Sequence, residues 1–161
     1  MDQANVLRSK IKLKDDFTIF PKVKKARVVT VTSGKGVVGK TNVVANLGLN
    51  LTKYGKKVLI LDADFGLANI EVLYGLVPSF SLANVFLGNK EIEDIISDGP
   101  NGVKFISAGS GFKDLANITD SQIKYILKSF TYLDEFYDII LVDTGAGMSN
   151  SVLNFVKVAT E

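Results

Sequence analysis

The 161 residues predict a three-layer α/β fold, in which a mostly parallel sheet carries helices on both faces. Two observations carry this prediction. Short apolar or β-branched runs alternate along the chain with segments of helical periodicity, as βαβ units require. Two of the runs, 57–64 and 137–145, are apolar almost throughout and end in acids, which is typical of strands buried on both faces of a parallel sheet.

The first 25 residues are predicted to stand apart from this domain. Residues 2–14 show apolar side chains at helical spacing behind Asp2, which can cap a short helix. Residues 15–26, interrupted by Pro21, predict a linker. We therefore divide the chain into a helix with a basic linker (1–25) and an α/β domain (26–161).

Within the domain, the strands and helices are expected to follow one another closely. We expect strands over 27–33, 57–64, 103–109 and 137–145, and helices over 41–54, within 67–98 (several short ones), over 120–135 and from 149 to the end. Val43, Leu47 and Leu51 supply the apolar stripe of the helix over 41–54. The inward positions of the helix over 120–135, which Asp120 starts, are Ile123, Ile126, Leu127 and Phe130.

Composition excludes several classes of protein. The chain has no cysteine, so disulfides, thiolate catalysis and thiolate-bound clusters are excluded. It has no histidine, so proton transfer falls to carboxylates, lysines or the substrate itself. Apolar residues make up 47% of the chain but never form a membrane-length run, so a cytoplasmic protein is the expectation.

Charge is unevenly distributed along the chain. Residues 1–27 hold eight Lys or Arg against three Asp, whereas the remainder holds eleven against fourteen acidic residues. The basic segment suits an acidic partner, an anionic membrane or nucleic acid, and a merely solvated lead-in explains the charge equally well.

The stretch SGKGVVGKTN (33–42) has the spacing of a phosphate-binding loop. Gly34 to Thr41 matches G-x-x-x-x-G-K-[ST] between an expected strand and an expected helix. In such a loop, backbone N–H groups and the helix dipole hold phosphate together. Lys40 is expected over the β- and γ-phosphates of a nucleotide, and the Thr41 hydroxyl on Mg²⁺. The alternative is a Gly-rich βα turn without a ligand.

Acidic residues end two of the other strands. Asp62 and Asp64 end one, and Asp143 ends the strand over 137–145. Ligands of open α/β sheets bind at the carboxyl ends of strands, so the three acids are expected beside the Gly-rich loop. Asp143 is placed to hold Mg²⁺. The alternative for Asp62 and Asp64 is that they only cap the helix that follows.

Taken together, these motifs resemble the MinD/ParA family of P-loop ATPases. SGKGVVGKT looks like the family's deviant loop with a second lysine, DADFGLAN (62–69) like its first switch and DTGAGMS (143–149) like its second. The opening DQANVLR (2–8) resembles the start of the FlhG branch (also FleN or YlxH), which controls flagellar number and placement. LANIEVLYG and SLANVFLGN also look more like this branch than like MinD.

The resemblance implies a P-loop NTPase fold and a role for each motif residue. Lys35 reaches across an ATP-dependent homodimer to the partner's nucleotide, and Asp64 orients the attacking water, so Lys35, Lys40 and Asp64 are the expected catalytic residues. Thr41, Asp62 and Asp143 surround the metal. The expected nucleotide-binding residues are Gly34, Lys35, Gly36, Val37, Val38, Gly39, Lys40, Thr41, Asn42 and Gly147.

Val37 departs from the family loop, which has a second glycine there. If position 37 needs positive φ, a β-branched residue costs about 1–3 kcal/mol. The alternative is that φ is negative and the side chain points harmlessly outward. We expect weakened but not abolished nucleotide binding.

The resemblance also implies partners. The N-terminal helix is expected to act on the SRP-type GTPase FlhF, and its partner-binding residues are Asp2, Gln3, Ala4, Leu7 and Arg8. Flagellar basal-body proteins or transcription regulators are further candidates, and DNA is not expected. Family members continue past the equivalent of Glu161 to a C-terminal helix that gives peripheral membrane association, so the chain is expected to be the N-terminal part of the ATPase domain.

Two other functions remain open. One is a ParA-like partition ATPase acting on DNA, which would bind DNA with a steep salt dependence. The other is a regulatory fragment that does not hydrolyse ATP and acts only through its N-terminal helix.

Overall fold

The computed structural model describes residues 25–65, 69–109 and 118–160. The helix expected over 2–14, most of the linker expected over 15–26, and the expected partner-binding residues lie outside these ranges. Among the described residues, no helix combines the length and the apolar character that crossing a membrane needs.

A five-stranded sheet forms the middle layer, with the order β1-β5-β2-β4-β3. Its strands are β1 (Arg27–Ser33), β2 (Val58–Ala63), β3 (Ser97–Asp98), β4 (Lys104–Ile106) and β5 (Ile139–Ala146). β1, β5, β2 and β4 pair in parallel, whereas β3 is antiparallel to β4. The sheet is therefore mostly parallel, as the sequence predicts.

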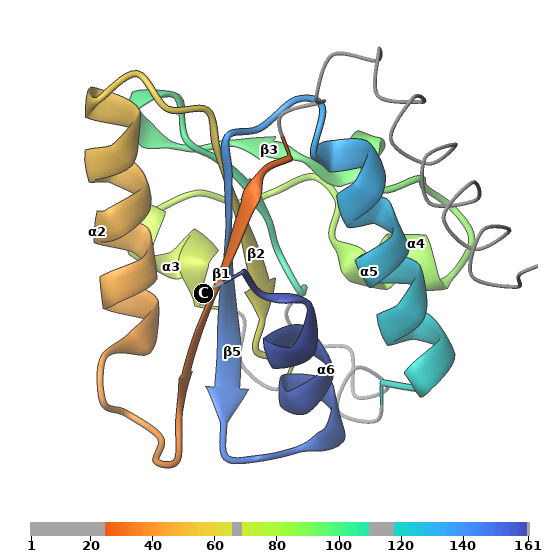
Figure 1. The fold of residues 1–161 in the computed structure, drawn as a ribbon. Coiled ribbons are helices and arrows are strands. Elements are labelled where there is room, and N and C mark those ends of the chain that lie inside the picture. The colour runs from red at the N-terminus through yellow and green to blue at the C-terminus, as the bar shows by residue number, and fades with distance from the viewer. Residues whose placement is uncertain (1–24, 66–68, 110–117, 161) are drawn as a thin grey trace, which may run out of the picture.

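Helices cover both faces of the sheet, which completes the three layers (Figure 1). They are α2 (Lys40–Lys53), α3 (Ile70–Tyr74), α4 (Leu82–Phe86), α5 (Asp120–Leu133) and α6 (Asn150–Val158), with short 3₁₀ turns η1 (Glu93–Ile95) and η2 (Pro100–Gly102). α2 and α3 lie on one face, and α4, α5 and α6 on the other (Figure 1). The predicted fold class is confirmed.

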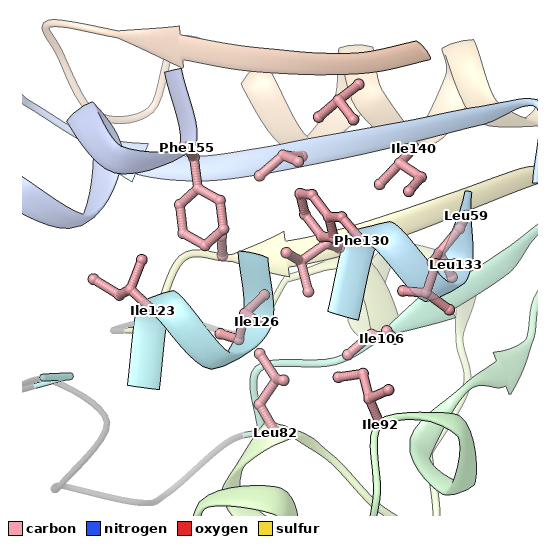
Figure 2. Close-up of a cluster of buried hydrophobic side chains, with 14 of the residues drawn as sticks. Leu59, Leu82, Ile92, Ile106, Ile123, Ile126, Phe130, Leu133, Ile140 and Phe155 are labelled. Carbon is pink, nitrogen blue, oxygen red and sulfur yellow. The ribbon is translucent and has the colours of Figure 1, made fainter. Parts of the chain in front are cut away.

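The larger core cluster lies between the sheet and α4, α5 and α6 (Figure 2). Ile123, Ile126 and Phe130 of α5 are buried there, as predicted, and Leu127 packs partly buried against the cluster. Thr119, one residue before the predicted start, caps α5, because its hydroxyl accepts a hydrogen bond from the N–H of Gln122.

The apolar stripe predicted for α2 is correct only at Leu51, which packs partly buried against the core cluster beneath α2. Val43 is 57% exposed and Leu47 is 37% exposed, whereas Val44, Ala45 and Gly48 are buried. The reason is close packing: a Cβ at Gly48 would lie 2.8 Å from Cδ1 of Ile60 in β2. Because α2 sits so close to β2 at Gly48, this part of its inner face carries Val44, Ala45 and Gly48, whereas Val43 and Leu47 are exposed.

Two details of the sheet were not predicted. β3 was missed, because two residues give no periodic signal. β4 is shorter than the strand predicted over 103–109, and Ser107 and Ala108 follow it as buried, non-strand residues. The other predicted strands agree with β1, β2 and β5 to within two residues.

Candidate functional site

The carboxyl ends of β1, β5 and β2 lie next to one another at one edge of the sheet (Figure 1). β1 leads into the Gly-rich loop and then into α2. Asp62 of β2 and Asp143 of β5 are paired neighbours in the sheet, and Asp64 follows directly after β2. The structure thus brings together the loop and the three acids that the sequence singles out.

The Gly-rich loop delivers the N-terminus of α2 to a cavity of about 590 Å³. Gly39 caps α2 with φ 91°, a left-handed conformation that favours glycine. No acidic side chain lies in the first turn of α2, so no residue of the helix itself neutralises its positive end. The cavity is lined by Gly36, Val37, Val38, Gly39, Lys40, Thr41, Asn42, Asp64, Asn69, Val72, Leu73 and Ala146. This geometry suits an anionic group such as phosphate.

The two lysines of the loop differ in their surroundings. The Lys40 ammonium donates a hydrogen bond of 3.2 Å to Oγ of Ser33, which in turn donates one of 2.6 Å to the Lys35 carbonyl. The Lys35 side chain is exposed to solvent. Lys40 is therefore held at the cavity by a weak neutral partner, and Lys35 is free to extend away from the domain.

Val37 has a positive φ and also a side chain that points outward. Its φ is 54°, so the β-branched residue does occupy the left-handed region, and its side chain is fully exposed. No packing contact compensates for the unfavourable backbone. The loop therefore carries strain at Val37, and its side chain stands at the mouth of the cavity.

Asp64 faces the cavity from the end of β2. It also lies against the carboxyl end of β5: a Cβ built on Gly145 would come within 3.3 Å of Oδ1 of Asp64. The missing side chain at Gly145 therefore gives the Asp64 carboxylate room between the two strand ends. Gly147, directly after β5, donates its N–H to the Ser33 carbonyl over 3.0 Å and has φ 94°.

Asp143 is buried, and neither of its carboxylate oxygens has a hydrogen-bond partner. Burial raises the pKa of Asp143, and nearby Asp64 raises it further, while the neighbouring Thr41 hydroxyl and Lys40 ammonium lower it. Thr41 and Lys40 lie close to the Asp143 carboxylate, but neither is within hydrogen-bonding geometry of its oxygens. A buried carboxylate without a partner is costly, and a cation together with ordered water would satisfy it.

These residues fit a magnesium ion. Mg²⁺ prefers carboxylate and hydroxyl oxygens and keeps several water or phosphate ligands. Asp143 offers unpaired oxygens, and Thr41 lies beside it. Among the described residues, no group of three or more acids gathers that would hold a metal by side chains alone. A metal here would depend on phosphate and water for its remaining ligands.

Asp62 is also fully buried, but its oxygens are occupied. Oδ1 accepts a hydrogen bond from the N–H of Asp64 (3.1 Å), and Oδ2 accepts from the N–H groups of Asn69 (2.8 Å) and Ile70 (3.3 Å). Burial raises the pKa of Asp62 to about 7 despite these bonds, and Asp143 contributes to the rise. Asp62 thus caps the start of the following helix α3, as the alternative prediction has it.

Several residues that line the cavity were not singled out from the sequence: Asn69, Val72, Leu73 and Ala146. Ser33, which holds Lys40, was missed as well. Exposed valine and leucine on a short helix carry no chemical signature, so only the fold could place them. Conversely, Gly34, Lys35 and Gly147, which the resemblance assigns to nucleotide binding, do not line this cavity.

Comparison with known proteins finds a matching family model and several similar proteins. A family model described as an AAA domain matches residues 26–160. The Antiactivator FleN of Pseudomonas aeruginosa is 43% identical over 135 residues, which cover 84% of this chain and 48% of that protein. The flagellum site-determining protein YlxH of Helicobacter pylori is 31% identical over 98% of this chain, and the match covers 54% of its own length.

A solved structure shows the same fold. The septum site-determining protein MinD of Pyrococcus horikoshii, complexed with Mg-ADP, superposes with a TM-score of 0.73 and 29% identity over 83% of this chain and 55% of that one. The chain spans about half the length of the curated relatives it matches. Since the AAA-domain model spans nearly the whole described part, and MinD, FleN and YlxH are all similar, the chain belongs to the AAA-domain family, in its MinD/ParA-type branch of P-loop ATPases.

Proposed function

We propose that the cavity at the Gly-rich loop binds ATP with Mg²⁺ and that the protein hydrolyses it slowly as a switch. The unpaired, buried carboxylate of Asp143 beside Thr41 and Lys40 is the observation that carries this proposal. It leaves an acidic group that needs a cation at the point where the loop and α2 offer a site for phosphate. The MinD that superposes on this chain was solved with Mg-ADP, which supports the same assignment.

Each residue of the site has its own role in nucleotide binding or hydrolysis. Lys40 exchanges its weak bond to Ser33 for the phosphate oxygens, where a charge-assisted bond is stronger. Thr41 and Asp143 hold Mg²⁺, which when bound neutralises charge on the phosphates. Asp64, beside Gly145 at the cavity wall, orients the attacking water. The exposed Lys35 is available to a nucleotide in a second copy of the chain.

We further propose that ATP drives dimerisation and that the whole protein controls flagellar number or placement. The similarity to FleN and YlxH supports this role. The YlxH match covers 98% of the chain and therefore includes most of the N-terminal segment, whose helix we propose to act on the GTPase FlhF. Association with a membrane surface, flagellar basal-body proteins or transcription regulators belongs to the same proposal for the whole protein.

Titration calorimetry with ATP and Mg²⁺ tests the core of this proposal. The parent is expected to bind ATP only in the presence of Mg²⁺, and Lys40→Ala is expected to weaken this binding by about tenfold to a hundredfold. Light scattering with ATP should show a dimer, and Lys35→Ala should remain monomeric while still binding ATP.

Other outcomes point to other functions. If neither the parent nor Val37→Gly binds ATP, the switch is refuted for this chain. In that case, stimulation of a GTPase by a peptide of residues 1–20 would support a regulatory fragment. DNA binding that weakens steeply with salt would instead favour the partition ATPase.

A further inference from the structure

Two carboxylates occupy paired positions on neighbouring strands of the site, but their surroundings differ. Asp62 and Asp143 are paired across β2 and β5, and both are fully buried. A carboxylate accepts about four hydrogen bonds. Asp62 already accepts three, from the N–H groups of Asp64, Asn69 and Ile70, whereas Asp143 accepts none. Asp143 therefore has its whole coordination capacity available for a metal, and Asp62 has almost none.

The three bonds to Asp62 hold together two parts of the site. Oδ1 fixes the backbone of Asp64 directly after β2. Oδ2 satisfies the first free N–H groups of α3, which helix starts require. Asn69, the N-cap residue of α3, makes no side-chain capping bond of its own. Asp62 thus takes over the capping of α3 from a neighbouring strand.

This anchor sets the position of a wall of the cavity. Val72 and Leu73 of α3 line the cavity together with residues of the Gly-rich loop. Ile70, whose N–H bonds to Asp62, is fully buried in the core cluster beneath α2 and α3. Glu71 of α3 also contacts Oγ of the buried Ser107, just after β4. α3 is therefore tied to the sheet at the ends of two strands.

We propose that Asp62 is a positioning residue that holds Asp64 and α3 in one fixed geometry at the site, and that of the paired acids Asp143, and not Asp62, is the metal ligand. This inference rests on the proposed function, because Asp62 acts on hydrolysis only through Asp64. It reassigns Asp62, which the family resemblance places among the residues around the metal.

Hydrogen exchange of the parent protein tests the anchor without any substitution. The amides of Asn69 and Ile70 should be protected in the unliganded protein and should stay at least as protected when Mg²⁺ and ADP are added. If Asp62 turned to the metal, it would release these amides, and their exchange would become about tenfold faster or more. Such a loss of protection on adding Mg²⁺ and ADP would overturn the proposal.

A matched pair of variants tests the division of roles. Asp143→Asn should raise the Mg²⁺ concentration for half-saturation of ATP binding about tenfold or more, since it removes the metal ligand. Asp62→Asn should change that concentration less than about threefold. It should nevertheless speed exchange at Asn69 and Ile70 and lower kcat about tenfold, since Asp64 is no longer held. An Mg²⁺ requirement that rises equally in both variants would refute the proposal.

The outcomes separate this inference from the proposed function. If the parent binds no nucleotide, the proposed function fails, whereas the amides of Asn69 and Ile70 still report on the anchor. Unprotected amides in the unliganded parent would refute the anchor whatever the nucleotide result. If Asp62→Asn does not fold, the exchange measurement on the parent remains decisive.

Discussion

Substituting Val37 by glycine measures the strain in the phosphate-binding loop. Val37 has φ 54° and a fully exposed side chain, so glycine removes no packing contact. A β-branched residue in the left-handed region costs about 1–3 kcal/mol. Glycine offsets part of this gain, because it adds about 0.5–1 kcal/mol of conformational freedom to the unfolded chain. We therefore expect Val37→Gly to raise the free energy of unfolding by about 1 kcal/mol.

Urea unfolding, followed by circular dichroism, is the assay. With a slope of about 2 kcal/mol per molar urea, the midpoint should rise by about 0.5 M at an unchanged slope. The sequence alone led us to expect that Val37 weakens nucleotide binding. Because φ of Val37 is already positive without a nucleotide, binding does not have to create this strain. The affinity for ATP should therefore change less than about threefold, even though the stability changes.

Val38→Gly is the matched control in the same loop. Val38 is 57% exposed and has no positive φ, so glycine there relieves no strain. We expect it to lower the midpoint slightly, through backbone entropy alone. If Val37→Gly is no more stable than the parent, or is destabilised as much as Val38→Gly, the argument from backbone strain is wrong.

Three further predictions concern the loop lysine, the buried acids and the packing of α2. Lys40→Ala should weaken ATP binding by about tenfold to a hundredfold in calorimetry, while its urea midpoint stays close to that of the parent, because the amine makes only one weak bond. Without Mg²⁺, the parent should lose stability as the pH rises from about 4 to about 7. The reason is that the pKa of Asp62 is raised from 3.8 to about 7 in the folded protein, so folded Asp62 keeps its proton at pH values where the unfolded chain has released it. Urea midpoints that rise with pH across this range would contradict this prediction. Gly48→Ala should destabilise the fold by about 1 kcal/mol in urea, since the added Cβ meets Ile60 and this overpacking outweighs the gain in helix propensity. Leu47→Ala, on the outer face of α2, is its control and should cost less.

The sequence predicts the fold class and most elements, because long apolar strands and capped amphipathic helices carry their own periodic signal. The prediction from sequence is wrong where tertiary packing determines which residues are buried or paired. The prediction for α2 was wrong at Val43 and Leu47, which look like a core stripe from their spacing. The inner face is formed there by Val44, Ala45 and Gly48, because α2 approaches β2 closely at Gly48. β3 was missed because it consists of two residues.

For the candidate site, the sequence identifies the loop and the acids but not their division of roles. Asp62 and Asp143 both end apolar strands, so the pattern alone treats them alike. Their difference arises from the backbone N–H groups of Asn69 and Ile70, which fold back onto one of them only. Likewise, the sequence left the sign of φ at Val37 open, because it depends on the path of the loop.

The pairing of β1 has a consequence for the order in which the protein takes shape during its synthesis. β1, which presents the phosphate-binding loop, pairs with β5, and Thr144 of β5 bonds to Val31 across 113 residues of chain. Thr160, 132 residues after Val28, bonds to the same strand. Contacts between such distant residues form late, because the ribosome must first release the distant partner. The phosphate-binding loop is therefore synthesised early but reaches its final conformation late. A nascent chain whose β5 has not yet left the ribosome should be unable to retain nucleotide.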